Sequence, residues 1–159
     1  MKSKKIATCA VLSALAIIFG YIEALFPLPL PIPGIKLGLG NIVVIVCLYI
    51  FGAKISFGIM LIKIFTSVLL FSPPSTLIYS LCGGALSFVI MLAMKKMSFN
   101  TITVSIGSGI FHNIGQLVAA AVVLNGLNLI YYLPLLIISG AMCGFITGLA
   151  AHLIIKRIV

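Results

Sequence analysis

Six long apolar stretches, separated by short segments that hold most of the charges, dominate this sequence of 159 residues. A helix needs about 20 apolar residues to cross the roughly 30 Å hydrocarbon core of a bilayer. The stretches lack the alternation of barrel strands and therefore predict helices. We expect an all-α integral membrane protein, a six-transmembrane-helix bundle formed by one domain (1–159), with spans at about 6–26, 37–51, 55–71, 76–94, 101–124 and 131–155.

The composition excludes the other broad classes of protein. Charged residues make up 7% of the chain, whereas soluble domains average about 25%. A small soluble domain could not cover its surface with so few polar groups. Disorder is excluded because 63% of the residues are apolar. The cations stand in small groups between apolar stretches, unlike the basic face of a nucleic-acid-binding protein, so nucleic acid is not an expected partner.

The cations also predict the orientation, because cytoplasmic loops are enriched in Lys and Arg. An N-terminus in the cytoplasm and six crossings place eight of the ten cations inside. Lys36 then lies outside and Lys63 lies within the third span. Both termini are therefore predicted to be cytoplasmic. The eight predicted cytoplasmic cations are Lys2, Lys4, Lys5, Lys54, Lys95, Lys96, Lys156 and Arg157.

Two of the spans have alternative interpretations. The first resembles a signal peptide in its basic start, but its apolar stretch is too long and no cleavage site follows, so we interpret it as a retained helix. The second span (37–51) is short. It is expected to tilt little, to thin the bilayer locally or to be partly re-entrant.

Ionisable residues within spans are costly and usually face a cavity or a partner. Glu23, the only acidic residue, stands near the outer end of the first span, and Lys36 begins the second at the same depth. They predict either a structural ion pair or a pair that controls substrate access. Lys63 lies near the middle of the third span. Its side chain either extends to the cytoplasmic interface or lines a cavity that receives an anionic ligand.

The fifth span carries a polar stripe in an otherwise apolar helix. Ser105, Ser108, His112 and Gln116 follow each other at steps of three and four, which places them on one helical face, with Asn113 beside them. One interpretation is interhelical hydrogen bonding. The other, which we favour, is contact with a ligand between the helices.

Small residues predict where backbones approach closely. Gly140, Gly144 and Gly148 form a packing face on the sixth span, and Gly83 and Gly84 predict a similar approach. The segment 33–41 holds three glycines and Asn41, which permit irregular backbone beside a cavity. A second stripe, on the first span, suits either intramolecular packing or docking of a partner helix and consists of Ala7, Ala10 and Ala14.

Several kinds of chemistry are absent from the sequence. One acidic residue cannot build a carboxylate site for Mg²⁺ or a carboxylate acid–base pair. No phosphate-binding loop is present. The histidines lie on different spans, and the cysteines (Cys9, Cys47, Cys82 and Cys143) are widely separated. We therefore expect no metal, no cofactor and no catalytic residue.

Four sequence segments carry a resemblance to the Gx transporter family. They are 33–41 (PGIKLGLGN), 79–84 (YSLCGG), 112–116 (HNIGQ) and 131–134 (YYLP) with Ser139 and Gly140. The match covers nearly the whole chain in the same order. One departure is Gly40, where the family pattern has Ala. Members are often labelled heptaprenyl diphosphate synthase component I, a label that the missing carboxylates do not support as a catalytic role.

The chain is also similar in plan to the substrate-binding S components of energy-coupling-factor transporters. That resemblance implies an alanine face on the first helix, here Ala10 and Ala14, that meets a transmembrane coupling subunit. It also implies that ATPases are supplied by other chains, and that the protein lies in a bacterial plasma membrane.

Three hypotheses follow. The first is a substrate-binding subunit or small carrier for a small anionic or amphipathic molecule, with prenyl- or quinone-related ligands suggested by the label. The second is a non-catalytic accessory subunit of a prenyl diphosphate or quinone enzyme, and the third, ranked last, is a membrane-embedded enzyme. For the first, residues 27–33 would control access, and the predicted substrate-binding residues are Glu23, Lys36, Asn41, Lys63, His112, Asn113 and Gln116.

Overall fold

The computed structural model describes residues 2–25, 38–124 and 127–158. Within these ranges the chain is helical and contains no strand. Each predicted span coincides with an α-helix, and a short 3₁₀ helix precedes the last one. The elements are α1 (Lys2–Leu25), α2 (Leu39–Ile50), α3 (Ala53–Phe71), α4 (Thr76–Lys96), α5 (Thr101–Val123), η1 (Leu127–Tyr132) and α6 (Leu133–Ile158).

Local sequence signals explain several helix ends. Pro73 and Pro74 follow α3 and prevent its continuation. Asn100 caps α5, because its side-chain oxygen accepts a hydrogen bond of 2.8 Å from the N–H of Thr103. Basic residues occupy the last turns of α4 and α6, where they complement the helix dipole.

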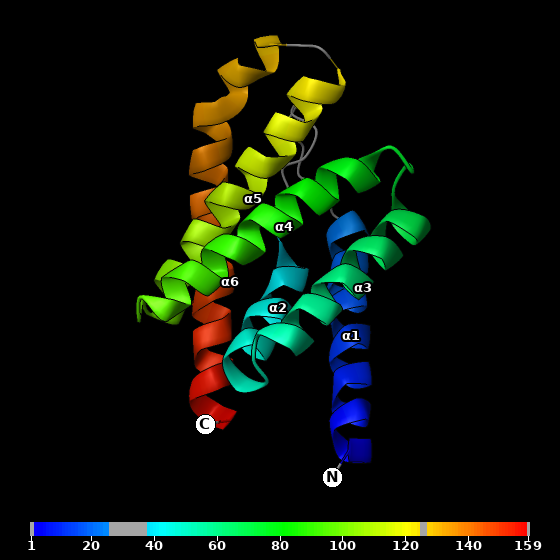
Figure 1. Cartoon of the computed structure of the whole chain (residues 1–159), viewed down its shortest axis with the longest axis vertical. Helices are drawn as coiled ribbons and strands as arrows, with labels where there is room; N and C mark the ends of the chain where they lie inside the picture. Colours follow the sequence, from blue (N-terminus) through cyan, green and yellow to red (C-terminus); the bar gives the residue numbers. More distant parts are fainter. Residues whose placement is uncertain (1, 26–37, 125–126, 159) are drawn as a thin grey trace.

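Five helices are long and apolar enough to cross a membrane, and within the described ranges α2 is the shorter exception. Its 12 residues extend for about 18 Å, which is less than the roughly 30 Å hydrocarbon core. The start of α1 and the end of α6 lie at the same end of the bundle (Figure 1). Six crossings would produce that arrangement, but the six crossings and the cytoplasmic termini stay predictions.

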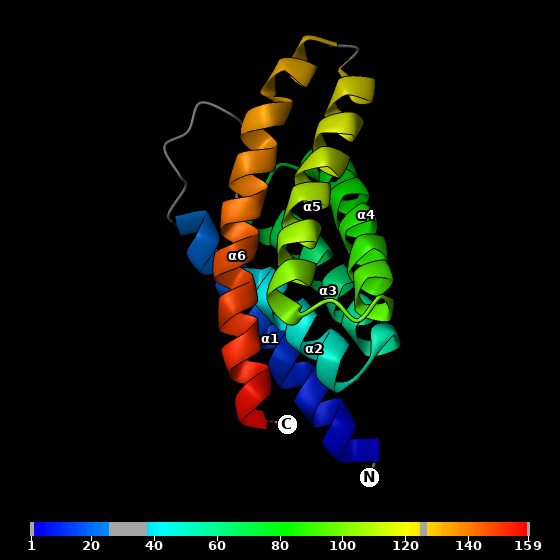
Figure 2. The same ribbon diagram turned by 90° about the vertical axis from the view of Figure 1, so that its left-hand side faces the viewer.

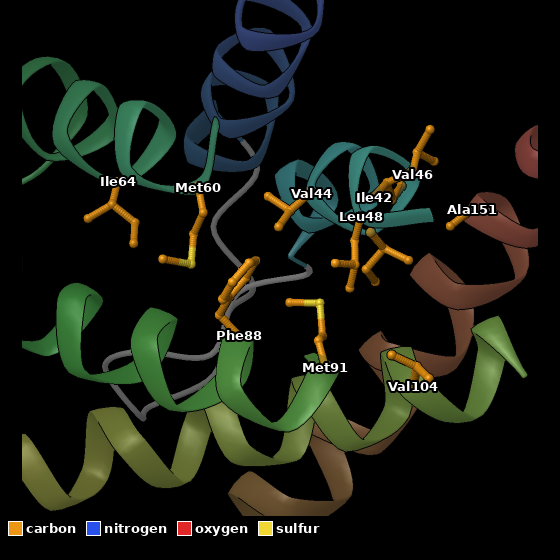
Figure 3. Packing of buried hydrophobic residues seen from close by; sticks show 11 residues of the cluster. Ile42, Val44, Val46, Leu48, Met60, Ile64, Phe88, Met91, Val104 and Ala151 are labelled. Atoms are coloured by element: carbon orange, nitrogen blue, oxygen red, sulfur yellow. The ribbon is translucent and has the colours of Figure 1, made fainter. Parts of the chain in front are cut away.

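The short helix α2 forms the centre of the bundle. Seven consecutive residues, from Ile42 to Leu48, are buried, so every face of the helix is covered by protein. Side chains from α3, α4, α5 and α6 join those of α2 in one core cluster, and Figure 3 labels Met60, Phe88, Val104 and Ala151 from these four helices. A helix that is apolar on all sides is stable only in such a position or in lipid.

Glycines allow α5 to pack closely against both of its neighbours. A Cβ added at Gly140 of α6 would lie 2.8 Å from the carbonyl oxygen of Gly109 of α5. A Cβ added at Gly115 of α5 would lie 2.9 Å from the carbonyl oxygen of Cys82 of α4. The close approaches predicted for the glycine stripe and for Gly83 are therefore confirmed, and Figure 2 shows α5 and α6 side by side.

Candidate functional site

A pocket of about 110 Å³ lies between the helices. All six helices contribute to its wall, and its lining includes every predicted site residue that the structure describes. Lys36 and residues 27–33 lie outside the described residues, so the pairing of Lys36 with Glu23 and the access role of the loop stay predictions. The predicted residues that line the pocket are Glu23, Asn41, Lys63, His112, Asn113 and Gln116.

One wall of the pocket is formed by the start of α2. Gly38 has a left-handed backbone conformation, with φ 70° and ψ 26°, which glycine adopts without a steric penalty. Its N–H donates a hydrogen bond to Glu23 Oε1 at the end of α1. The predicted irregular backbone is thus present at this point, and the carboxylate of Glu23 is fixed to it.

Lys63 enters the same pocket from α3. Its Nζ donates a hydrogen bond of 2.6 Å to Asn41 Oδ1 in the first turn of α2. Gly40 leaves room for the lysine stem, because a Cβ at that position would lie 2.8 Å from Lys63 Cε and 3.1 Å from the carbonyl oxygen of Ala16. Of the two interpretations of Lys63, the structure supports the cavity-lining one.

The polar stripe of α5 faces the pocket along its length. Ser105, Ser108, His112 and Gln116 all line it. The two serines also join helices, because Ser105 Oγ lies 3.0 Å from Thr147 Oγ1 of α6. Ser108 Oγ similarly lies 2.9 Å from Ser87 Oγ of α4. Interhelical hydrogen bonding is therefore present at Ser105 and Ser108, which also line the pocket, and ligand contact by the stripe stays a prediction.

Asn113 has a structural contact as well as a place in the lining. Its Nδ2 donates a hydrogen bond of 2.8 Å to the carbonyl oxygen of Leu136 in α6. Ser139 Oγ donates to the same carbonyl oxygen at 3.1 Å. The amide nitrogen therefore holds α5 against α6.

Sequence reasoning missed several small polar residues of the lining. Ser67 is four residues beyond Lys63 and therefore shares its helical face, which was the available signal. Its Oγ is buried and has no hydrogen-bond partner among the described residues. A single hydroxyl residue in an apolar helix gives little indication that it lines a pocket. The other missed lining residues are Ser72, Ser80 and Thr147.

The lining of the pocket carries charges of both signs, from Glu23 and Lys63, and several hydrogen-bonding groups. Lys63 supplies a positive charge, and the N-terminus of α2, which begins beside Gly38, adds the positive end of a helix dipole. Hydroxyl, amide and imidazole groups offer both donors and acceptors. No group of three or more potential metal ligands occurs among the described residues.

The alanine stripe of α1 faces away from the other described helices. Ala7, Ala10 and Ala14 are exposed, so the stripe is not used for packing within the described residues. Of the two interpretations of the stripe, docking of a partner helix agrees with this exposure and stays a prediction.

Comparison with known proteins gives one match. A family model described as heptaprenyl diphosphate synthase component I matches residues 12–154. No curated protein and no solved structure matches the chain significantly. The matched segment covers all of α2 to α5 and most of α1 and α6. The chain therefore belongs to the heptaprenyl diphosphate synthase component I family.

Proposed function

We propose that the chain is a substrate-binding subunit of a membrane transport system, or a small carrier, for a small molecule that bears an anionic group. The pocket carries this proposal. It gathers Glu23, Lys63, His112 and Gln116 from three helices around one space. Placing such groups within membrane spans is costly, and a ligand that uses them accounts for that cost better than packing does.

The size of the pocket limits the ligand. An enclosed cavity of about 150 Å³ accepts benzene, so the 110 Å³ observed here suits a molecule of comparable or smaller bulk. A heptaprenyl chain does not fit within it. If the ligand is prenyl- or quinone-related, as the family label suggests, only its polar head would enter the pocket while the chain lies in lipid.

The test compares the wild type with the double variant His112→Leu/Gln116→Leu. Native mass spectrometry of protein released gently from the membrane should find a small molecule with the wild type and not with the variant. His152→Leu is the matched control, because His152 is exposed on α6. Equal retention of the molecule by all three proteins would remove the pocket as the binding site.

The resemblance to Gx transporters and to S components adds a partner to this proposal. The exposed alanines of α1 would contact a coupling subunit in the bacterial plasma membrane, and ATPases on other chains would supply energy. Introducing Ala10→Leu should reduce copurification of that subunit. Ala85→Leu on the exposed face of α4 should leave it unchanged.

A second function is favoured by the family name, which describes one component of a synthase. In that case the chain would be a non-catalytic accessory subunit that holds a prenyl-synthesising enzyme at the membrane. Copurification with such an enzyme, together with no small molecule in the mass spectra, would support this second function over the first.

A further inference from the structure

The pocket holds both signs of charge, although the chain contains only one acidic residue. Glu23 comes from α1 and Lys63 comes from α3. Each is costly at this depth. The chain therefore places its single carboxylate in the same small space as a lysine, beside the predicted ligand.

The two charges are held at opposite ends of one helical turn. Glu23 accepts the N–H of Gly38, and Lys63 donates to Asn41 Oδ1 at 2.6 Å. The N–H of Asn41 in turn donates to the carbonyl oxygen of Gly38 at 2.8 Å, which fixes the turn between them. The first turn of α2 thus spaces a negative and a positive site.

From this arrangement we propose that the ligand is a small zwitterion of the α-amino-acid type, which rests on the binding function proposed above. Its ammonium group would contact Glu23, and its carboxylate would contact Lys63 and the N-terminus of α2. The opposite charges of pocket and ligand would then balance, whereas a simple anion would leave an excess charge in a low-dielectric site.

Two further observations agree with this ligand class. Ser67 Oγ is buried without a hydrogen-bond partner among the described residues and follows Lys63 on the same face of α3. It would donate to the carboxylate. The volume of 110 Å³ also suits a compact molecule such as alanine.

The experiment measures binding of L-alanine, propionate and ethylamine to the purified full chain by isothermal titration calorimetry. These probes share a two-carbon or three-carbon frame and differ in which charged groups they carry. We expect L-alanine to bind at least about 10-fold more tightly than either single-charge probe, a ratio that corresponds to about 1.4 kcal/mol. If propionate binds as tightly as L-alanine, or if L-alanine does not bind, the proposal of a zwitterionic ligand is wrong.

Two variants assign the charged groups. Glu23→Gln should weaken the binding of L-alanine by about 10-fold or more and leave the binding of propionate unchanged or tighter. Lys63→Met should weaken the binding of L-alanine and leave the binding of ethylamine unchanged. Lys54→Met, at an exposed position, is the control and should change nothing. If a variant does not fold, the wild-type comparison of the three probes still decides the question.

The outcome separates this inference from the proposed function. If a copurified molecule is lost in His112→Leu/Gln116→Leu but the three probes show no preference for the zwitterion, only the ligand class is wrong. If that double variant changes nothing, the pocket itself is not the binding site.

Discussion

Lys95 Nζ of α4 donates a hydrogen bond of 2.6 Å to the carbonyl oxygen of Leu48, in the last turn of α2. Carbonyl groups in that turn lack an intrahelical N–H partner. The same ammonium group lies 4.7 Å from the centre of the Tyr49 ring, a cation–π contact. The carboxyl end of the central helix is therefore capped by a side chain from a different helix, at the end of α2 opposite to Gly38.

Removing this cap should destabilise the protein. Lys95→Met leaves the Leu48 carbonyl without its charged donor, and hydrogen bonds of this kind contribute about 1.5–3 kcal/mol. We expect thermal unfolding in detergent, followed by far-ultraviolet circular dichroism, to occur at a lower temperature. Lys96→Met, which changes an exposed neighbour, is the control. Equal melting of the two variants would show that the cap contributes nothing.

The contact between α5 and α6 should not tolerate a methyl group at Gly140. An added Cβ would lie 2.8 Å from the carbonyl oxygen of Gly109 and 3.0 Å from Asn113 Nδ2. Because the first neighbour is backbone, Gly140→Ala must separate the helices, and such overpacking costs about 1–3 kcal/mol.

Gly58 in α3 provides the matched control for that substitution. A Cβ added there meets nothing within 4 Å. Gly58→Ala should therefore stabilise the helix by up to about 1 kcal/mol through its higher helix propensity. The two variants should move the unfolding temperature in opposite directions, and a destabilised Gly58→Ala would contradict the packing described for α3.

The hydrogen bond between Asn41 and Lys63 should appear as a coupling energy. Asn41→Leu removes the acceptor of the Lys63 hydrogen bond. The loss of stability caused by Asn41→Leu should therefore be larger in the wild type than in the Lys63→Met background. A double-mutant cycle in detergent should give a coupling of about 1–3 kcal/mol. Additive effects would mean that this hydrogen bond contributes nothing to stability.

The sequence predicted the helices well because their ends carry local signals. Pro73 and Pro74 end α3, and Asn100 caps α5, so both boundaries could be located within a residue or two. The position of α2 could not be predicted in this way. An entirely apolar helix is equally suited to lipid and to a protein interior, and only the packing around Val44 and Leu48 shows which surrounds it.

The candidate site could be predicted where a side chain is costly in a membrane. Glu23, Lys63 and His112 are rare residue types in such helices, and all three line the pocket. Serine and threonine are cheaper, since they form hydrogen bonds to their own helix. Thr147, whose hydroxyl donates to the carbonyl oxygen of Cys143 at 2.9 Å, therefore gave no distinct signal. The contact of Asn113 with Leu136 depends on the approach of a distant helix.

The turns on either side of α4 provide a test of the six crossings. Ser75, before α4, and Ser98, after it, are both exposed. The 21 residues of α4 extend for about 30 Å, and six crossings would place the two serines on opposite sides of a membrane. With a cytoplasmic N-terminus and a crossing α2, Ser75 is outside and Ser98 is inside.

Cysteine labelling distinguishes the two topologies. In a variant with Cys9, Cys47, Cys82 and Cys143 replaced by Ala, a membrane-impermeant maleimide added to intact cells should modify Ser75→Cys and not Ser98→Cys. If α2 is re-entrant and does not cross, every later segment changes sides and the pattern reverses. Although α2 is too short to cover the full hydrocarbon core, protein encloses it along Ile42 to Leu48. A helix that does not contact lipid does not have to match the thickness of the hydrocarbon core in order to cross it. We therefore expect the first pattern.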